Sequence, residues 1–216
     1  MESSKEVFAE GICFKKILLI FIFGSLFGCV MEVGLHFLKY NNLVSRQALI
    51  YGPFNPVYGF GAAIITLCLG KQTKPLLIFI WGALLGGAVE YSCSFIQEHV
   101  FGTISWNYSN HFLNFNGRTS LFYMLCWGMI TLVYIKFFYP FLSRHIEKIP
   151  IKIGKILTVF LTILIILDAA ISITACYRMK ERINDEKANN KIEVFLDKHY
   201  PNERLKKIYP NAKKIK

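Results

Sequence analysis

Residues 24–32 read GSLFGCVME, and residues 82–90 read GALLGGAVE. Both stretches follow the pattern G-x-x-x-G-x-x-x-E, and each lies in a run of apolar residues. A spacing of four places both glycines and the glutamate on one face of an α-helix, where glycine lets a neighbouring backbone approach closely. The shared pattern predicts that the two helices pack against each other through these faces.

The sequence around these stretches predicts an internal repeat. After each glutamate comes a polar, aromatic-rich loop, and then a further apolar run. Residues 17–70 and 75–139 are therefore interpreted as two copies of one helix-loop-helix unit. In such a repeat the first helices of the two copies run parallel.

The composition indicates a membrane protein. Of the 216 residues, 54% are hydrophobic, and the mean hydropathy is +0.39, which exceeds what a soluble domain of this size needs for its core. A bilayer core needs roughly 20 apolar residues per helical crossing, and about five such runs occur. They cover residues 17–38, 53–70, 75–96, 119–139 and 156–177. We expect an all-α integral membrane protein of about five transmembrane helices.

This interpretation divides the chain into a membrane domain at residues 1–177 and a basic C-terminal tail at residues 178–216. The tail pattern predicts a short amphipathic helix broken by Pro201, with a solvated end as the alternative. The net charge of +11 favours the anionic headgroups of a lipid bilayer as partner over nucleic acid. Lys and Arg occur on both faces of the predicted topology, so the positive-inside rule assigns no orientation.

The N-terminal run has an alternative interpretation as a signal sequence. Lys15-Lys16, a short apolar run and Cys29 loosely resemble a lipoprotein cleavage site. The apolar run continues past Cys29 to Leu38, which favours a transmembrane helix. The six cysteines of the chain show no C-x-x-C spacing and are interpreted as packing residues.

Three acidic residues, Glu32, Glu90 and Asp168, lie inside the predicted helices. A charge at mid-bilayer costs about 2.5 to 3.5 kcal/mol, so these carboxylates require partners, protonation or water. At about 1.5 Å per residue, the glutamates lie roughly 22 Å along their helices and Asp168 roughly 18 Å along its own. We expect the three to meet at one depth and to line a cavity for a small polar or cationic solute. The alternative is that they only hold the bundle together through hydrogen bonds.

Basic and polar residues near these acids complete the predicted site. Arg118 is expected to pair with the acids, with Arg46 as a second candidate. The remaining candidate substrate-binding residues come from two loops rich in prolines, glycines and aromatic residues, and are Asn55, Tyr58, Trp106, Asn114 and Asn116. The first loop is expected to fold partly into the membrane, and a plain aromatic belt is the alternative for the second.

Neither a metal site nor a catalytic centre is predicted. His36 follows Glu32 by one helical turn, which suits a proton or metal pair, but no second histidine stands at ligand spacing. An intramembrane enzyme would need a nucleophile beside a base, such as Ser92 or Ser94 near Glu90, and nothing in the spacing requires this. No cofactor and no catalytic residue are assigned.

Several longer motifs carry a resemblance to a known family. They are Gly52-Pro53, Tyr58 to Gly61, Trp106 to Ser109, Asn114 to Arg118, Trp127-Gly128, Asp168 with Ser172 and Arg178, Phe195 to Pro201, and Tyr209 to Asn211. Together they resemble the CmpB-like family of putative ABC-transporter permeases, over nearly the whole chain. One departure is Asn107, where we expect the family pattern to hold aspartate.

The resemblance implies a small multispanning transport permease of the bacterial cell membrane. The chain has no G-x-x-x-x-G-K-[ST] phosphate loop and so cannot bind ATP as an ABC ATPase does, which implies a separate ATPase subunit. The coupling-loop signature of many importer permeases is also missing. A homodimer is expected because one small chain encloses a pathway poorly. The alternative is a non-transport assembly or sensing subunit whose acids pair with Arg118.

Overall fold

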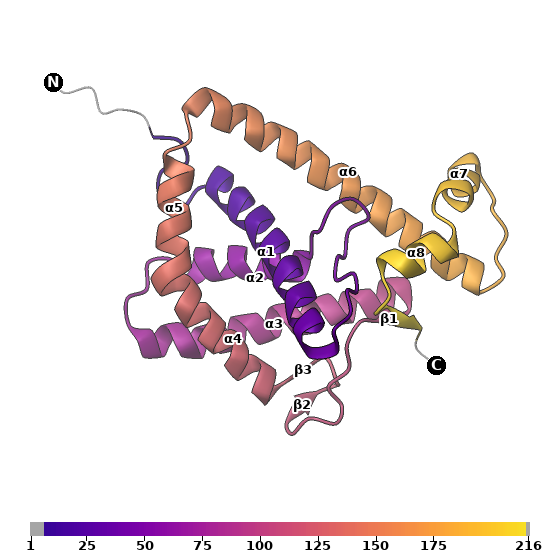
Figure 1. Cartoon of the computed structure of the whole chain (residues 1–216), viewed down its shortest axis with the longest axis horizontal. Helices are drawn as coiled ribbons and strands as arrows, with labels where there is room; N and C mark the ends of the chain where they lie inside the picture. The colour runs from indigo at the N-terminus through magenta and orange to yellow at the C-terminus, as the bar shows by residue number, and fades with distance from the viewer. Residues whose placement is uncertain (1–6, 215–216) are drawn as a thin grey trace.

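The structure is a computed structural model that describes residues 7–214, and these residues form a mainly helical fold (Figure 1). The helical segments are α1 Phe14–Tyr40, α2 Pro56–Leu69, α3 Pro75–Phe101, α4 Leu121–Val133, the π-helical segment η1 Tyr134–Phe138, α5 Tyr139–Glu147, α6 Ile151–Ile183, α7 Lys191–His199 and α8 Asn202–Ile208. The strands are β1 Thr103–Ile104, β2 Asn114–Phe115, β3 Thr119–Ser120 and β4 Lys213–Lys214. β1 pairs with β4 and β2 with β3, both antiparallel. The predicted all-α class is confirmed.

Within the described chain, 4 helical stretches are long and apolar enough to cross a membrane. They are α1, α3, the continuous stretch Leu121–Glu147 and α6. The second predicted span is shorter than expected: α2 has 14 residues, about 21 Å, against a bilayer core of about 30 Å. It begins at Pro56 because Asn55 caps it, its side chain accepting a hydrogen bond from the Val57 amide. Five full-length spans are therefore not confirmed.

The long helices extend beyond their predicted ends. α3 continues to Phe101 because residues such as Glu98 favour helix although they are not apolar, and it stops where Gly102 adopts a φ of 65°. The fourth stretch continues through Pro140 to Glu147, whereas the predicted span ended at residue 139. The π-helical turn just before this proline accommodates its missing amide donor.

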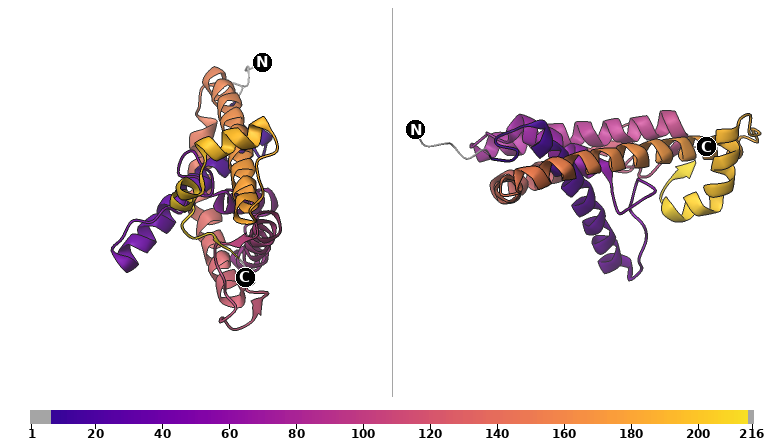
Figure 2. Two further views of the ribbon diagram at one scale, coloured as in Figure 1. Left: turned by 90° about the vertical axis from the view of Figure 1, so that its right-hand side faces the viewer. Right: turned by 90° about the horizontal axis from the view of Figure 1, so that it is seen from above.

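Two helix pairs form the central packing of the molecule. α1 packs along α2, and α3 along α4 (Figure 1). One buried cluster joins α2, α3 and the fourth stretch, and consists of Ile65, Leu69, Ile78, Trp127 and Ile135. The C-terminal half of α1 projects from the rest of the molecule in both views of Figure 2. Its apolar side chains are exposed, Leu38 by 82%, as expected for a helix whose solvent is lipid.

The loops gather at two ends of the molecule. At one end the Lys16 ammonium pairs with Glu147 in α5, and Phe8 packs against Gly154 at the start of α6. At the other end Asn211 of the tail donates to the main-chain oxygen of Ser45, and β4 pairs with β1. Successive helices therefore lead back and forth between the two ends, with α2 making the shortest passage.

Candidate functional site

The two glycine faces do not pack against each other, and this prediction was wrong. A Cβ atom added at Gly28 would lie 2.1 Å from Cγ of Tyr58 in α2, and one added at Gly86 would lie 2.4 Å from Cγ of Trp127 in α4. Each glycine therefore makes room for an aromatic ring of the next helix along the chain. Sequential elements usually lie side by side, which explains why the partner is the following helix and not the other glycine face.

Glu32 lies one helical turn beyond Gly28 and reaches the first loop, residues 41–55. Its Oε2 atom accepts from Tyr58 Oη at 3.4 Å and from Asn55 Nδ2 at 3.3 Å. Its Oε1 atom lies 3.6 Å from the guanidinium of Arg46, which was the second candidate cation. The carboxylate thus has three donors, while 34% of its side chain stays exposed.

Glu90 lies one turn beyond Gly86 and is more deeply buried, with 8% of the residue exposed. Its two carboxylate oxygens accept from Tyr108 Oη at 3.1 Å and from Thr119 Oγ1 at 2.7 Å. Burial and the neighbouring carboxylate raise the pKa of Tyr108 far above its usual range, so this hydroxyl stays a donor. Among the ion pairs of residues 7–214, none involves Glu90.

An aromatic pair links the surroundings of the two glutamates. The rings of Tyr58 and Trp127 lie with centroids 6.1 Å apart. Tyr58 donates to Glu32, and the Trp127 ring fills the space beside Gly86, one helical turn before Glu90. The two predicted acids from the repeat therefore share a neighbourhood built from α1, α2, α3 and α4.

Asp168 has different partners, although it is buried as well. Its Oδ1 atom accepts from the Tyr51 amide at 3.1 Å and from Ser172 Oγ at 3.0 Å. Tyr51 in turn hydrogen-bonds Tyr200 of the tail, with 2.6 Å between the hydroxyl oxygens. The other oxygen, Oδ2, is buried without a hydrogen-bond partner in the described chain. Asp168 thus joins α6, the first loop and the tail, and its bonding partners are not those of the glutamates.

Arg118 does not pair with any of the three predicted acids. Its guanidinium lies 2.5 Å from a carboxylate oxygen of Glu98, over the rings of Tyr91 and Phe95 at 5.3 and 5.4 Å. Glu98 lies two turns beyond Glu90 on α3. The prediction missed this partner because it ended the helix at residue 96, where the apolar run stops.

Three other predicted site residues make hydrogen bonds that build the second loop, residues 102–120. Trp106 donates from Nε1 to the main-chain oxygen of Arg118 at 2.8 Å. Asn114 accepts from the Gly117 amide at 3.0 Å, and Asn116 donates to a tyrosine hydroxyl on α3 at 3.2 Å. The loop that they shape carries Tyr108, whose bond to Glu90 was not predicted from the sequence.

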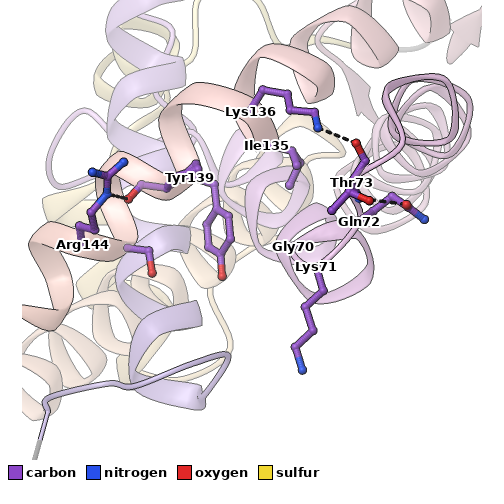
Figure 3. Close-up of a pocket in the computed structure, with 10 residues that line it drawn as sticks. Gly70, Lys71, Gln72, Thr73, Ile135, Lys136, Tyr139 and Arg144 are labelled. Carbon is purple, nitrogen blue, oxygen red and sulfur yellow. Dashed lines mark hydrogen bonds between the residues drawn. The ribbon is translucent and has the colours of Figure 1, made fainter.

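Two cavities of the molecule have no acidic residue in their walls. One, of about 380 Å³, lies beside Thr119 and Asn116 and is lined mostly by apolar residues of α3 and α4. The other, of about 400 Å³, lies at the opposite end beside Lys71 and Lys136 (Figure 3). The expected acid-lined cavity does not coincide with either.

The described residues hold no group of three or more His, Cys, Asp and Glu side chains placed to bind a metal ion. His36 instead hydrogen-bonds the main-chain oxygen of Asn42 at 3.1 Å through Nδ1. The cysteines of this part of the chain are unpaired. The geometry of the site therefore consists of carboxylates, hydroxyls and aromatic rings.

The comparisons with known proteins agree with the resemblance noted in the sequence. A family model described as putative ABC-transporter type IV matches residues 19–173. Searches of curated proteins and of solved structures gave no match. The matched range runs from α1 into α6 and contains Glu32, Glu90 and Asp168. Since this range covers well over half of the chain, the protein belongs to the putative ABC-transporter type IV family.

Proposed function

We propose that this chain is the membrane subunit of a transporter and that Glu32 and Glu90 bind a small polar or cationic solute. The proposal rests on the burial of Glu90 and on the neutral groups that surround its carboxylate. Glu90 is a buried carboxylate on a helix long enough to span the bilayer, and its hydrogen bonds come from neutral groups, among them the hydroxyls of Tyr108 and Thr119. A carboxylate buried among neutral groups must bind a cation or a proton, because an unpaired charge there costs free energy.

The surroundings of the two glutamates suit a cationic solute. Both carboxylates stand one turn beyond a glycine that admits an aromatic ring, and each accepts from a tyrosine hydroxyl. The neighbouring rings of Tyr58 and Trp127 supply aromatic surface of the kind that attracts an ammonium group in other cation sites. This equivalence of position also supports the proposed internal repeat.

The other residues expected at the site have supporting roles in this proposal. They shape the two loops or anchor the tail, and are Asn55, Trp106, Asn114, Asn116, Arg118 and Asp168. A separate ATPase subunit, a homodimer and the bacterial cell membrane belong to the same proposal. They rest on the family and on the small size of one chain.

The competing function is a non-transport assembly or sensing subunit. It is favoured by the ion pair between Arg46 and Glu32, which joins α1 to the first loop, although Arg118, the cation first expected to pair with the acids, contacts Glu98 instead. In that case the glutamates hold helices and loops together and need no solute. A binding measurement separates the two functions.

The test measures thermal unfolding of the detergent-solubilised protein with sodium, choline or spermidine as cationic probes. We expect at least one probe to raise the melting temperature of the natural protein and to have no such effect on Glu90→Gln. Glu203→Gln removes one exposed carboxylate from α8 and is the matched control, which should respond like the natural protein. If Glu90→Gln is less stable but responds to the same probe by the same shift, Glu90 is structural and the transport role fails.

A further inference from the structure

The cavity of about 400 Å³ at the end opposite the glutamates is built by two segments distant in sequence (Figure 3). The connection from α2 to α3 supplies one wall, and η1 with α5 supplies the other. The lining residues are Gly70, Lys71, Gln72, Thr73, Ile135, Lys136, Tyr139, Pro140, Ser143 and Arg144. In Figure 3 the ring of Tyr139 lies between Arg144 and Lys71.

The lining of this cavity carries three positive charges, from Lys71, Lys136 and Arg144, and no negative one. The carboxylate nearest to it along α5, Glu147, is paired with the buried Lys16 ammonium. The cavity charge is therefore not neutralised by that acid. An uncompensated cluster of this kind attracts anions.

The donors of the cavity are partly held in place. Lys136 donates from Nζ to the main-chain oxygen of Thr73 at 2.6 Å, which ties the two walls together. Arg144 donates from Nε to the main-chain oxygen of Pro140 at 3.2 Å, which fixes the base of its guanidinium. The two terminal nitrogens of Arg144 remain suited to a bidentate contact with a phosphate, and the second cation adds charge.

The helical stretch that supplies one wall of the cavity also carries exposed aromatic side chains next in sequence to the lining residues. Phe137, Phe138 and Phe141 are exposed by 71%, 50% and 60%. They flank Lys136 and Pro140 in sequence and lie in a stretch apolar enough to cross the membrane. A basic cavity beside apolar side chains is what the headgroup and acyl chains of an anionic lipid would contact together.

We propose that this cavity binds a phosphate group, supplied either by an anionic phospholipid headgroup or by a small soluble phosphorylated compound. Its volume falls within the roughly 300 to 1,000 Å³ usual for ligand sites. The Tyr139 hydroxyl of the lining adds a neutral donor, whereas the Ser143 hydroxyl already donates to Glu147 at 3.2 Å. This site is independent of the solute site proposed at Glu32 and Glu90.

The test uses the full chain in a neutral detergent, with native mass spectrometry to measure ligand affinity. The lipid arm compares phosphatidylglycerol with phosphatidylcholine, whose headgroup has no net charge. The soluble arm uses glycerol 3-phosphate. The variant Lys71→Gln with Arg144→Gln removes two charges and keeps the bond between Lys136 and Thr73. Lys148→Gln with Lys152→Gln removes two exposed charges at the same end, outside the cavity.

We expect phosphatidylglycerol to bind more tightly than phosphatidylcholine, and the cavity variant to lose about tenfold or more in affinity for it. The control variant should bind like the natural protein. Equal losses in both variants, or equal binding of the two lipids, would overturn the proposal. Competition by glycerol 3-phosphate identifies a site open to soluble phosphates, and lipid binding without competition identifies a headgroup site. Circular dichroism of each variant checks that it is folded.

Discussion

Gly28 and Gly86 show why single residues decide the packing of the two helix pairs. At both positions the space of a Cβ atom is filled by an aromatic ring of the next helix. Replacing either glycine by alanine should destabilise the protein by about 1 to 3 kcal/mol, because the ring must leave its place. Thermal or chemical unfolding in detergent measures this loss.

Gly34 is the matched control, since it lies on the same helix as Gly28 with no atom within 4 Å of an added Cβ. Gly34→Ala should leave stability unchanged or raise it by up to about 1 kcal/mol, because alanine favours helix. If Gly34→Ala and Gly28→Ala lose the same amount, the close contact with Tyr58 is not what makes glycine necessary.

The ion pair between Lys16 and Glu147 joins a buried cation of α1 to a partly exposed acid of α5. The lysine side chain is 1% exposed and the glutamate side chain 32% exposed. Glu147→Gln leaves a buried ammonium without its counterion and should cost about 3 kcal/mol or more. Lys16→Met leaves a carboxylate that water reaches, and should cost less. Unfolding measurements that reverse this order would show that the lysine charge is solvated in the folded protein.

Single residues also mark the limits of sequence prediction. The glutamates were found because a carboxylate inside an apolar run is conspicuous whatever its surroundings. Their hydroxyl partners Tyr108 and Thr119 were not, because a hydroxyl in a loop gives no pattern in sequence. The partner of Arg118 was assigned wrongly since Glu98 lay just outside the predicted span.

At the scale of elements, α7 is held to the end of α6 by a cluster of charges. Asp197 of α7 accepts from Arg178 Nε at 2.9 Å and from Arg182 at 2.5 Å. Arg178 also meets Glu181 and Glu193, at 2.9 and 3.9 Å. The hydrogen bond from Arg178 is the main reason that the pKa of Asp197 lies below its usual range, and Arg182 adds to it.

A lowered pKa fixes the sign of the pH dependence. The contribution of Asp197 is complete above the unfolded pKa of about 3.9 and is lost as the pH falls through the lower folded value. Hydrogen exchange of the α7 amides, corrected for the intrinsic rates, should therefore be constant between pH 8 and about pH 5. Protection should fall below about pH 4.

The variant Asp197→Asn tests the same cluster at neutral pH. It should lower the opening free energy of α7 by about 1 to 2 kcal/mol, since the aspartate is partly exposed. Asp185→Asn is the control: Asp185 is exposed, has a φ of 61°, and asparagine tolerates this conformation. Unchanged α7 protection in Asp197→Asn would show that apolar contacts alone hold the element.

The elements themselves were predictable to different degrees. Runs of about 20 apolar residues located the four long stretches because the bilayer thickness fixes that length. Their ends were not predictable from hydropathy, since α6 extends through polar residues to Ile183. The break at Pro201 between α7 and α8 was foreseen, and the pairing of β4 with β1 was not, because it joins segments far apart in the chain.

For the whole molecule, composition predicted that lipid surrounds the protein and that the fold is helical. It did not predict which helix faces pack against each other. The glycine motifs specify a close contact without naming the partner, and the partner follows from chain connectivity. The common depth expected for the three acids likewise rested on distance along each helix alone. It therefore could not distinguish the shared surroundings of Glu32 and Glu90 from those of Asp168.

The path of the chain between the two ends of the molecule requires α2 to cross the bilayer, although it has only 14 residues. Cysteines placed singly at Glu10, Asn42, Lys74 and Asn110, in a chain without the natural cysteines, report the side of each segment. With α2 crossing, an impermeant maleimide reaches Asn42→Cys and Asn110→Cys from one side and the other two from the opposite side.

The structure favours this outcome because contacts tie the N-terminal segment and the α2–α3 connection to one end of the fourth stretch: Lys16 pairs with Glu147, and Lys136 binds Thr73. The first loop and the tail meet at the other end. If Asn42→Cys and Lys74→Cys instead react from the same side, α2 enters the bilayer and returns to the same side of the membrane without crossing it. The chain would then cross four times, and Glu32 and Glu90 would point toward opposite sides of the membrane.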